Sequence, residues 1–282
     1  MFRTAILAFA FALAMGVAQP ALAQAVDLQL VLAVDTSGSV SEARFELQKR
    51  GYVAAFRSPR LLQAIGSGSA RAIAVTMTQW TGPVLQIQVV PWTLIQDEAS
   101  MHAFADAIDR APRQLFGGGT SISGAIDHAM TLFPNTGFQG ARRVIDISGD
   151  GANNRGRPAT AARDDAVRAG ATINGLPILV LEPYLDRYYW DSVVGGPGAF
   201  VVPAESYETF ADAVLKKLVI EIAAIDEPRS ACRRHRPAPS TSAMLVTTRA
   251  IDSSTAAHGA DKRPPLSRWQ PGCAQAFGTF AD

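Results

Sequence analysis

Residues 28–39 read Leu-Gln-Leu-Val-Leu-Ala-Val-Asp-Thr-Ser-Gly-Ser. A short, mostly apolar run that ends in turn residues is typical of a buried β-strand. Directly after it, one carboxylate and two hydroxyls stand at alternate positions: Asp35, Ser37 and Ser39. Mg²⁺ and similar cations prefer oxygen ligands of this kind, so the loop after the strand is a candidate cation site.

Apolar runs alternate with amphipathic segments from about residue 25 to residue 224. Strands are expected at Leu28–Val34, Ala72–Trp80, Val84–Val90, Arg143–Ser148, Ile178–Leu181 and Phe200–Val202. Helices are expected, from apolar residues at three- and four-residue spacings, at Glu42–Phe56, Ala99–Ala111, Ile122–Leu132, Ala159–Ala169, Tyr184–Val194 and Tyr207–Ala223.

This alternation predicts an α/β fold: a Rossmann-like open, mostly parallel sheet with helices on both faces. Only Thr81-Gly82-Pro83 separate the second and third expected strands. Three residues are too few for a crossover helix, so these two strands are predicted to form an antiparallel hairpin at one edge of the sheet.

Two further loops are expected at the same end of the sheet as Asp35. Gly117-Gly118-Gly119-Thr120 precedes a helix, and Gly149-Asp150-Gly151 follows the strand that ends at Ser148. Ligands of open α/β sheets bind outside the carboxyl ends of the strands. We therefore predict that one cation site is formed by Asp35, Ser37, Ser39, Thr120 and Asp150.

Each of these motifs also has an ordinary explanation. Ser39 and Glu42 fit a helix capping box, and Ser41 is another cap candidate for the same helix. Thr120 fits a helix N-cap, and Asp150-Gly151 fits a simple turn. Their occurrence in one chain, in this order and after successive strands, favours the metal site.

The three motifs resemble those of the von Willebrand factor type A (vWA) domain, whose metal-ion-dependent adhesion site (MIDAS) they form. The resemblance covers about Val26 to Ala224, and the chain is also similar to a branch of exported bacterial proteins with this domain and no assigned role. It implies that Ser37, Ser39 and Thr120 contact Mg²⁺ directly, with Mn²⁺ or Ca²⁺ as alternatives. Asp35 and Asp150 would then act largely through bound waters.

The chain departs from the family pattern before Asp150, where Ile147-Ser148-Gly149 replaces an apolar residue followed by Thr. Asp146 lies inside the preceding strand, on the face of Ser148 if the strand is regular. It is interpreted as the partner of an arginine such as Arg142 rather than as support for the metal site. Asn153 and Asn154 are interpreted as ordinary loop residues.

A cation held by neutral hydroxyls keeps much of its charge and attracts an external carboxylate. We therefore predict a protein-binding domain that docks an acidic side chain of a partner. An enzyme is not expected, because the chain has no Gly-x-Ser-x-Gly elbow and its four histidines lie on expected helices or in the C-terminal part. A metal-dependent hydrolase using the same residues, and a structural domain with a vestigial site, remain as alternatives.

The two ends of the chain differ in composition from the α/β region between them. Residues 1–23 are interpreted as a signal peptide, because Arg3 precedes the apolar stretch Ala5–Val17 and Ala21-Leu22-Ala23 forms a cleavage signal. The protein is therefore expected to be exported, either periplasmic or secreted, with no membrane-spanning segment in the mature chain. The vWA-like domain is placed at residues 24–225.

Residues 226–282 are rich in Pro, Ser, Thr, Ala and Arg without periodicity, and a disordered extension is expected there. Its two cysteines, Cys232 and Cys273, form a disulfide with each other, stay free or pair between molecules, and an exported location alone does not decide among these. With a formal charge of +1 and 18% charged residues, nucleic acid is not an expected partner.

Overall fold

The protein's structure, a computed structural model, describes residues 23–134 and 136–223. The expected signal peptide (apart from Ala23), the expected extension at 226–282 and both cysteines lie outside the described residues. Among the residues described, no helix is both long and apolar enough to span a bilayer.

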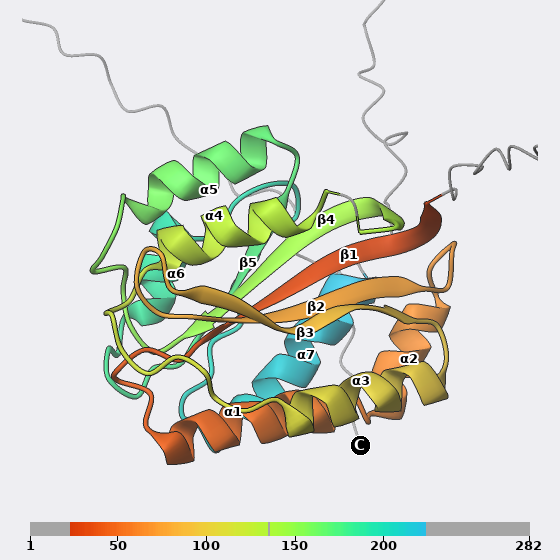
Figure 1. The fold of residues 1–282 in the computed structure, drawn as a ribbon, viewed down its shortest axis with the longest axis horizontal. Helices are drawn as coiled ribbons and strands as arrows, with labels where there is room; N and C mark the ends of the chain where they lie inside the picture. Colours follow the sequence, from red (N-terminus) through yellow and green to blue (C-terminus); the bar gives the residue numbers. More distant parts are fainter. Residues whose placement is uncertain (1–22, 135, 224–282) are drawn as a thin grey trace, which may run out of the picture. The chain divides into compact units, whose positions relative to one another are not determined.

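Five strands in the described part of the chain form one sheet in the order β3-β2-β1-β4-β5 (Figure 1). Their bounds are β1 Gln24–Asp35, β2 Ile73–Trp80, β3 Gln86–Ile95, β4 Phe138–Gly149 and β5 Thr172–Pro177. β1 runs parallel to β2 and to β4, β4 runs parallel to β5, and β3 pairs antiparallel with β2 at the edge. The predicted fold class, including the antiparallel edge strand, is confirmed.

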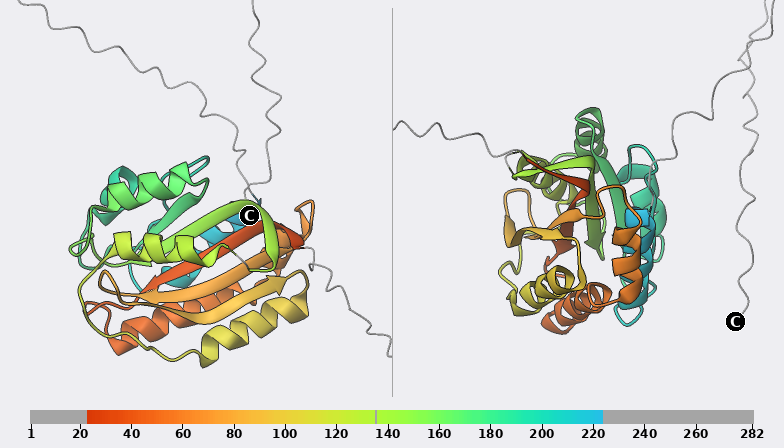
Figure 2. Two further views of the ribbon diagram at one scale, coloured as in Figure 1. Left: turned by 45° about the horizontal axis from the view of Figure 1, so that its top comes forward. Right: turned by 90° about the vertical axis from the view of Figure 1, so that its right-hand side faces the viewer.

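Helices cover both faces of this sheet (Figure 2). Their bounds are α1 Glu42–Ala55, α2 Pro59–Gly66, α3 Glu98–Arg110, α4 Ile122–Leu132, α5 Ala159–Arg168, α6 Leu185–Ser192 and α7 Phe210–Ala223. The β1 side chains explain the two layers. Leu30 and Leu32 pack in a core with α1, α2, α3 and α7, whereas Val31 and Ala33 pack in a second core with α4, α5 and α6. A strand buried on both faces is typical of a parallel sheet.

The last strand was wrongly predicted. The observed strand is β5, Thr172–Pro177, which precedes both expected segments. Ile178 forms an isolated bridge to Ala204, and Val201 an isolated bridge to Gly175. Asn174 and Gly175 are residue types that are depleted in strands, so the sequence did not predict β5. Asn174 is buried because it bonds to Glu221, and a Cβ on Gly175 would lie 2.6 Å from Tyr189 Cδ1, so the close approach of α6 needs glycine there.

Smaller differences concern the other elements. α2 was not predicted, although Ser58 followed by Pro59 marks its start. β3 begins at Gln86 rather than Val84, and α7 begins at Phe210, which leaves Tyr207 in the segment before the helix.

Candidate metal centre

The pairing of β1 with β4 sets the geometry of the candidate centre. The register ends with Val34 opposite Ser148, so Asp35, the last residue of β1, and Asp150, the first residue after β4, leave the sheet side by side. Both carboxylates are fully buried, with 0% of each residue exposed. Two buried acids that lie so close together are stabilised either by a proton or by a source of positive charge.

Hydrogen bonds connect four of the five predicted residues. Ser39 Oγ donates to Asp150 Oδ1 at 2.5 Å, and Ser37 Oγ lies 3.2 Å from Ser39 Oγ. The backbone N–H of Ser37 donates to Asp35 Oδ1 at 2.7 Å, which folds the Asp-x-Ser-x-Ser loop back over the end of β1. The side chains of Asp35, Ser37, Ser39 and Asp150 therefore belong to one cluster.

Thr120 reaches the same cluster from the glycine loop. Its side chain is buried, and a Cβ built on Gly151 would lie 3.8 Å from Thr120 Oγ1, so the hydroxyl adjoins the Asp150–Gly151 turn. Gly118 and Gly119 have φ angles of 103° and 82°, which explains why glycines precede Thr120. The structure thus brings all five predicted residues together at the carboxyl ends of the central parallel strands.

Helix capping does not explain the hydroxyls of Ser39 and Thr120. The N-cap of α1 is Ser41, whose Oγ accepts from Arg44 N at 3.3 Å. The N-cap of α4 is Ser121, whose Oγ accepts from Gly124 N at 3.1 Å. Because neighbouring serines do the capping, the ordinary explanation offered by the sequence for Ser39 and Thr120 is wrong.

The electrostatics of the cluster fit a cation. Burial and, to a smaller extent, the neighbouring Asp150 carboxylate raise the pKa of Asp35 to about 7, against hydrogen bonds from Ser37 that lower it. Asp35 Oδ2 is buried and has no hydrogen-bond partner among the described residues. A positive ion beside Asp35 would supply the interaction partner that Asp35 Oδ2 lacks among the described protein atoms.

The oxygen spacing fits as well. Adjacent ligands in an octahedron with metal–oxygen distances of 2.0–2.1 Å lie about 3 Å apart, close to the 3.2 Å between Ser37 Oγ and Ser39 Oγ. In the described part of the chain, no three His, Cys, Asp or Glu side chains are grouped to hold a metal ion. A cation here would therefore depend on the hydroxyls, and that these five residues bind a metal stays a prediction.

Three residues around the centre were missed by sequence reasoning. Tyr207, in the segment before α7, donates from its OH to Asp150 Oδ2 at 2.8 Å. Arg44 Nη1 donates to Ser39 O at 2.8 Å and lies 3.7 Å from Asp150 Oδ2, and Gln48 Nε2 donates to Asp35 O at 3.2 Å. Arg44 and Gln48 lie four residues apart on the first turns of α1. Because that helix directly follows the Asp35–Ser39 loop, the sequence could have predicted that both side chains lie near the loop.

The loop after Asp150 is fixed by side-chain amides. Asn154 Oδ1 accepts from Thr120 N at 2.9 Å, and Asn153 Oδ1 accepts from Ser123 N at 3.1 Å. Asn153 Nδ2 also donates to Arg157 O at 3.2 Å. The two asparagines therefore join the Asp150 loop to the start of α4, where Thr120 lies.

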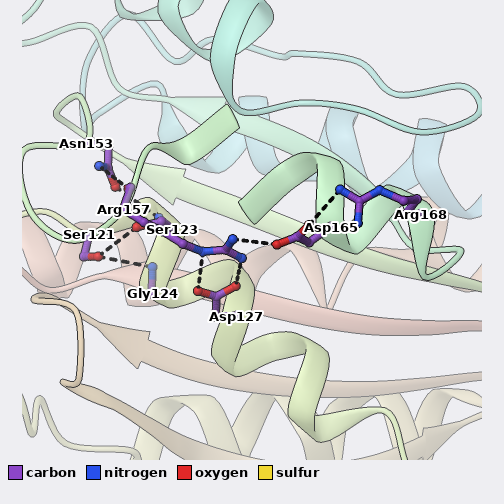
Figure 3. A network of polar contacts seen from close by, with 8 residues as sticks. All are labelled: Ser121, Ser123, Gly124, Asp127, Asn153, Arg157, Asp165 and Arg168. Atoms are coloured by element: carbon purple, nitrogen blue, oxygen red, sulfur yellow. Dashed lines mark hydrogen bonds and ion pairs between the residues drawn. The ribbon is translucent and has the colours of Figure 1, made fainter. Parts of the chain in front are cut away.

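An ion-pair network fixes the far end of this loop (Figure 3). Arg157 binds both carboxylate oxygens of Asp127 on α4, at 3.0 and 2.5 Å, and Asp165 on α5 at 2.5 Å. Arg168 then pairs with Asp165 at 2.8 Å. These contacts hold α4, α5 and the Asp150 loop in one arrangement.

Asp146 belongs to a different cluster. Its Oδ2 lies 2.7 Å from Lys217 Nζ, and Lys217 also pairs with Glu221 at 3.3 Å, all within the protein interior. Arg142, the partner suggested by the sequence, donates instead to the backbone carbonyl of Glu221 at 2.9 Å. The basic partner of Asp146 is therefore on α7.

The raised pKa of Asp35 predicts a pH dependence of the metal-free protein. Folding raises the pKa from 3.8 to about 7, so between these values the folded state holds more protons and stability falls as pH rises. With EDTA present, we expect wild type to lose about 3 kcal/mol relative to Asp35→Asn between pH 5 and pH 8. Urea unfolding at each pH measures it; an unchanged difference between the two proteins would contradict the assignment.

A family described as "Protein of unknown function (DUF1194)" matches residues 25–226 of the chain. The chain belongs to the DUF1194 family. No curated protein shows significant similarity to this DUF1194 chain.

Solved structures resemble this DUF1194 protein in fold. Proximal thread matrix protein 1 from the mussel byssus aligns with a TM-score of 0.51 and 15% identity over 70% of this chain and 48% of its own. Another of its structures, described with a zinc-occupied MIDAS motif, gives a TM-score of 0.50 and 13% identity over 70% and 46%. The pilus adhesin SpaC from Lactobacillus rhamnosus GG gives 0.50 and 15% over 70% and 31%.

A von Willebrand factor type A protein from Catenulispora acidiphila aligns with a TM-score of 0.49 and 18% identity over 70% of this chain and 43% of its own. The DUF1194 chain spans less than half the length of each of these proteins. At these identities the likeness concerns the fold alone, an α/β fold shared with the mussel protein and with SpaC.

Proposed function

We propose that this DUF1194 protein is an exported interaction domain that binds Mg²⁺, with Mn²⁺ or Ca²⁺ as alternatives, and docks an acidic residue of a protein partner on it. Ser37, Ser39 and Thr120 would contact the cation directly, and Asp35 and Asp150 would act largely through bound waters. The observation that carries the proposal is the buried Asp35 Oδ2, which has no hydrogen-bond partner in the described part of the chain. Beside it lie the hydroxyls of Ser39 and Thr120, whose neighbours Ser41 and Ser121 cap the helices instead.

The donor set favours docking over catalysis. When bound, the cation would supply positive charge that the neutral hydroxyls leave largely uncompensated, so a carboxylate from a partner is a favourable further ligand. The protein's own residues do the rest: Asp150 orients the Ser39 hydroxyl, Asn154 holds the Thr120 backbone, and Ser37 N–H orients Asp35.

Known proteins of the same fold support the proposal. The mussel protein is described with a zinc-occupied MIDAS motif, and SpaC is described as a pilus adhesin. Export is proposed from the Arg3 to Ala23 signal pattern alone. The partner, proposed to be a protein rather than nucleic acid, is identified only by its acidic side chain.

We propose no enzymatic activity. Within the described residues, the two histidines lie on helices: His102 on α3 pairs with Glu98 at 4.0 Å, and His128 lies on α4. Neither contacts the Ser37 or Ser39 hydroxyl through a hydrogen bond in that part of the chain. Mg²⁺-dependent hydrolysis of p-nitrophenyl esters or phosphates that Asp35→Ala abolishes would contradict this and favour the hydrolase.

Calorimetric titration of the EDTA-treated protein with Mg²⁺ tests the metal site. We expect wild type to bind Mg²⁺ and Thr120→Ala to bind it at least about tenfold more weakly, because one ligand is lost. Thr131→Ala, which removes a hydroxyl that donates to the His128 carbonyl on α4, is the matched control and should bind normally. No heat of binding, together with no shift in Tm on adding Mg²⁺ or Mn²⁺, would refute the proposal.

A further inference from the structure

Exposed apolar side chains of the described residues gather near the carboxyl ends of the parallel strands, where the candidate centre lies. Six of the eight large hydrophobic residues that are exposed lie in loops that follow β2, β5 or α3: Val84, Leu85, Phe116, Val180, Leu181 and Tyr184. Single exposed hydrophobic residues are common, but a group around one site marks an interaction surface.

The first cluster, Val84, Leu85 and Phe116, adjoins the glycine loop. A Cβ on Gly118 would lie 2.7 Å from Leu85 Cδ1, so the turn between β2 and β3 packs directly against this loop. Val84 is 86% exposed and Phe116 is 62% exposed. These side chains therefore lie beside the loop that carries Thr120.

Arg113 attaches Phe116 to the Asp35 loop. The guanidinium carbon of Arg113 lies 4.9 Å from the centroid of the Phe116 ring. Arg113 Nη2 donates to Thr36 O at 2.9 Å and to Ser37 O at 3.2 Å. The exposed ring is thus held in place by a residue that also braces the predicted metal loop.

The second cluster, Val180, Leu181 and Tyr184, follows β5 and surrounds Glu182. Glu182 Oε1 accepts from Ala152 N at 3.1 Å, next to the Asp150 turn. A Cβ on Gly151 would lie 3.5 Å from the same oxygen. Because β1 and β4 lie between β2 and β5 in the sheet, the candidate centre lies between the two apolar clusters.

The charges around the centre favour an anionic partner. Arg44 lies 3.7 Å from Asp150, Arg113 braces the Asp35 loop, and Arg155 packs against Gly119, where a Cβ would lie 2.6 Å from Arg155 Cγ. The nearby exposed carboxylates are Glu42, which lies 3.7 Å from Arg113, and Glu182. These three arginines nearly balance the carboxylates of Asp35, Asp150, Glu42 and Glu182. A divalent cation at the centre would therefore give the site a positive charge and attract an acidic ligand.

We infer that the two apolar clusters and the centre form one docking surface for a protein segment in which an acidic residue lies between apolar residues. The inference rests on the proposed docking of an acid on the metal, and it adds the character of the residues that flank that acid. The carboxylate would occupy the centre while its neighbours cover Leu85 and Phe116 on one side and Leu181 and Tyr184 on the other.

Two labelled heptapeptides with one central glutamate test this, one flanked by Leu and Phe and the other by Ser. In Mg²⁺ we expect fluorescence polarisation to show at least about tenfold tighter binding of the apolar peptide, an advantage within reach of burying one apolar side chain. EDTA, or a central glutamine, should abolish binding. Phe116→Ser should remove most of the advantage, whereas Ile220→Ser on α7, which also removes an exposed apolar residue (42%), should leave it unchanged.

The outcomes separate the inference from the proposed function. Equal Mg²⁺-dependent binding of both glutamate peptides would overturn the inference and leave the docking of an acid intact. Binding of neither peptide would overturn both, and Mg²⁺ calorimetry on the same samples would show whether the metal site itself exists. Concentration-dependent dimers that Phe116→Ser dissolves, seen by sedimentation, would assign the surface to a second copy of the chain and overturn the inference.

Discussion

Replacing Lys217 by methionine is expected to lower the free energy of unfolding by about 3–5 kcal/mol. Lys217 Nζ lies 2.7 Å from Asp146 and 3.3 Å from Glu221, and all three side chains are buried. Methionine fills a similar volume but leaves two carboxylates without their counter-charge. Urea unfolding measures the loss.

The adjacent lysine provides the control. Lys216 is exposed on the same turn of α7, so Lys216→Met should change stability by less than about 0.5 kcal/mol. Adding Asp146→Asn and Glu221→Gln to Lys217→Met should recover part of the loss, because the unpaired charges are removed. A loss below about 1 kcal/mol in Lys217→Met would show that the buried pair contributes little.

The loss should also depend on pH. Burial raises the pKa of Asp146, Glu221 raises it further and Lys217 lowers it. Without Lys217, the pKa of Asp146 should rise again, so the folded state takes up a proton that the unfolded state does not hold. Lys217→Met should therefore be less destabilising at pH 5 than at pH 8.

The sequence predicted the sheet well where local pattern and tertiary environment agree. Val31 and Ala33 alternate with Leu30 and Leu32 in a strand that is buried on both faces, and the run is apolar throughout. β5 was not predicted because Asn174 and Gly175 are suited to tertiary contacts, with Glu221 and with the Tyr189 ring. Local strand propensity does not reflect those contacts.

The candidate centre was predictable for a similar reason. Its five residues lie in short motifs directly after strands or before a helix, and parallel pairing then places those loops together. Tyr207 and Lys217 gave no such signal. Each reaches its carboxylate from the segment before α7 or from α7 itself, and a contact of this kind depends on how that helix packs on the sheet.

Replacing Asp150 by asparagine is expected to weaken Mg²⁺ binding by about 100-fold, the upper part of the range for groups that support metal ligands. Asp150 is one of the two buried carboxylates of the centre and accepts the Ser39 hydroxyl at 2.5 Å. Asparagine keeps the shape and removes the charge. Calorimetric titration with Mg²⁺ gives the change in affinity, and Asp212→Asn, at an exposed position of α7, should leave it unaltered.

A second variant distinguishes the charge of Asp150 from its contacts. Tyr207→Phe removes the hydroxyl that donates to Asp150 Oδ2 at 2.8 Å and leaves both carboxylates in place. If the carboxylate charge is what binds the cation, Tyr207→Phe should change Mg²⁺ affinity by less than about tenfold. Asp150→Asn should also lower the raised pKa of Asp35, because a neighbouring like charge is gone. Equal losses in the two variants, with the pKa of Asp35 unchanged, would mean that Asp150 serves only to hold Tyr207 and the segment before α7.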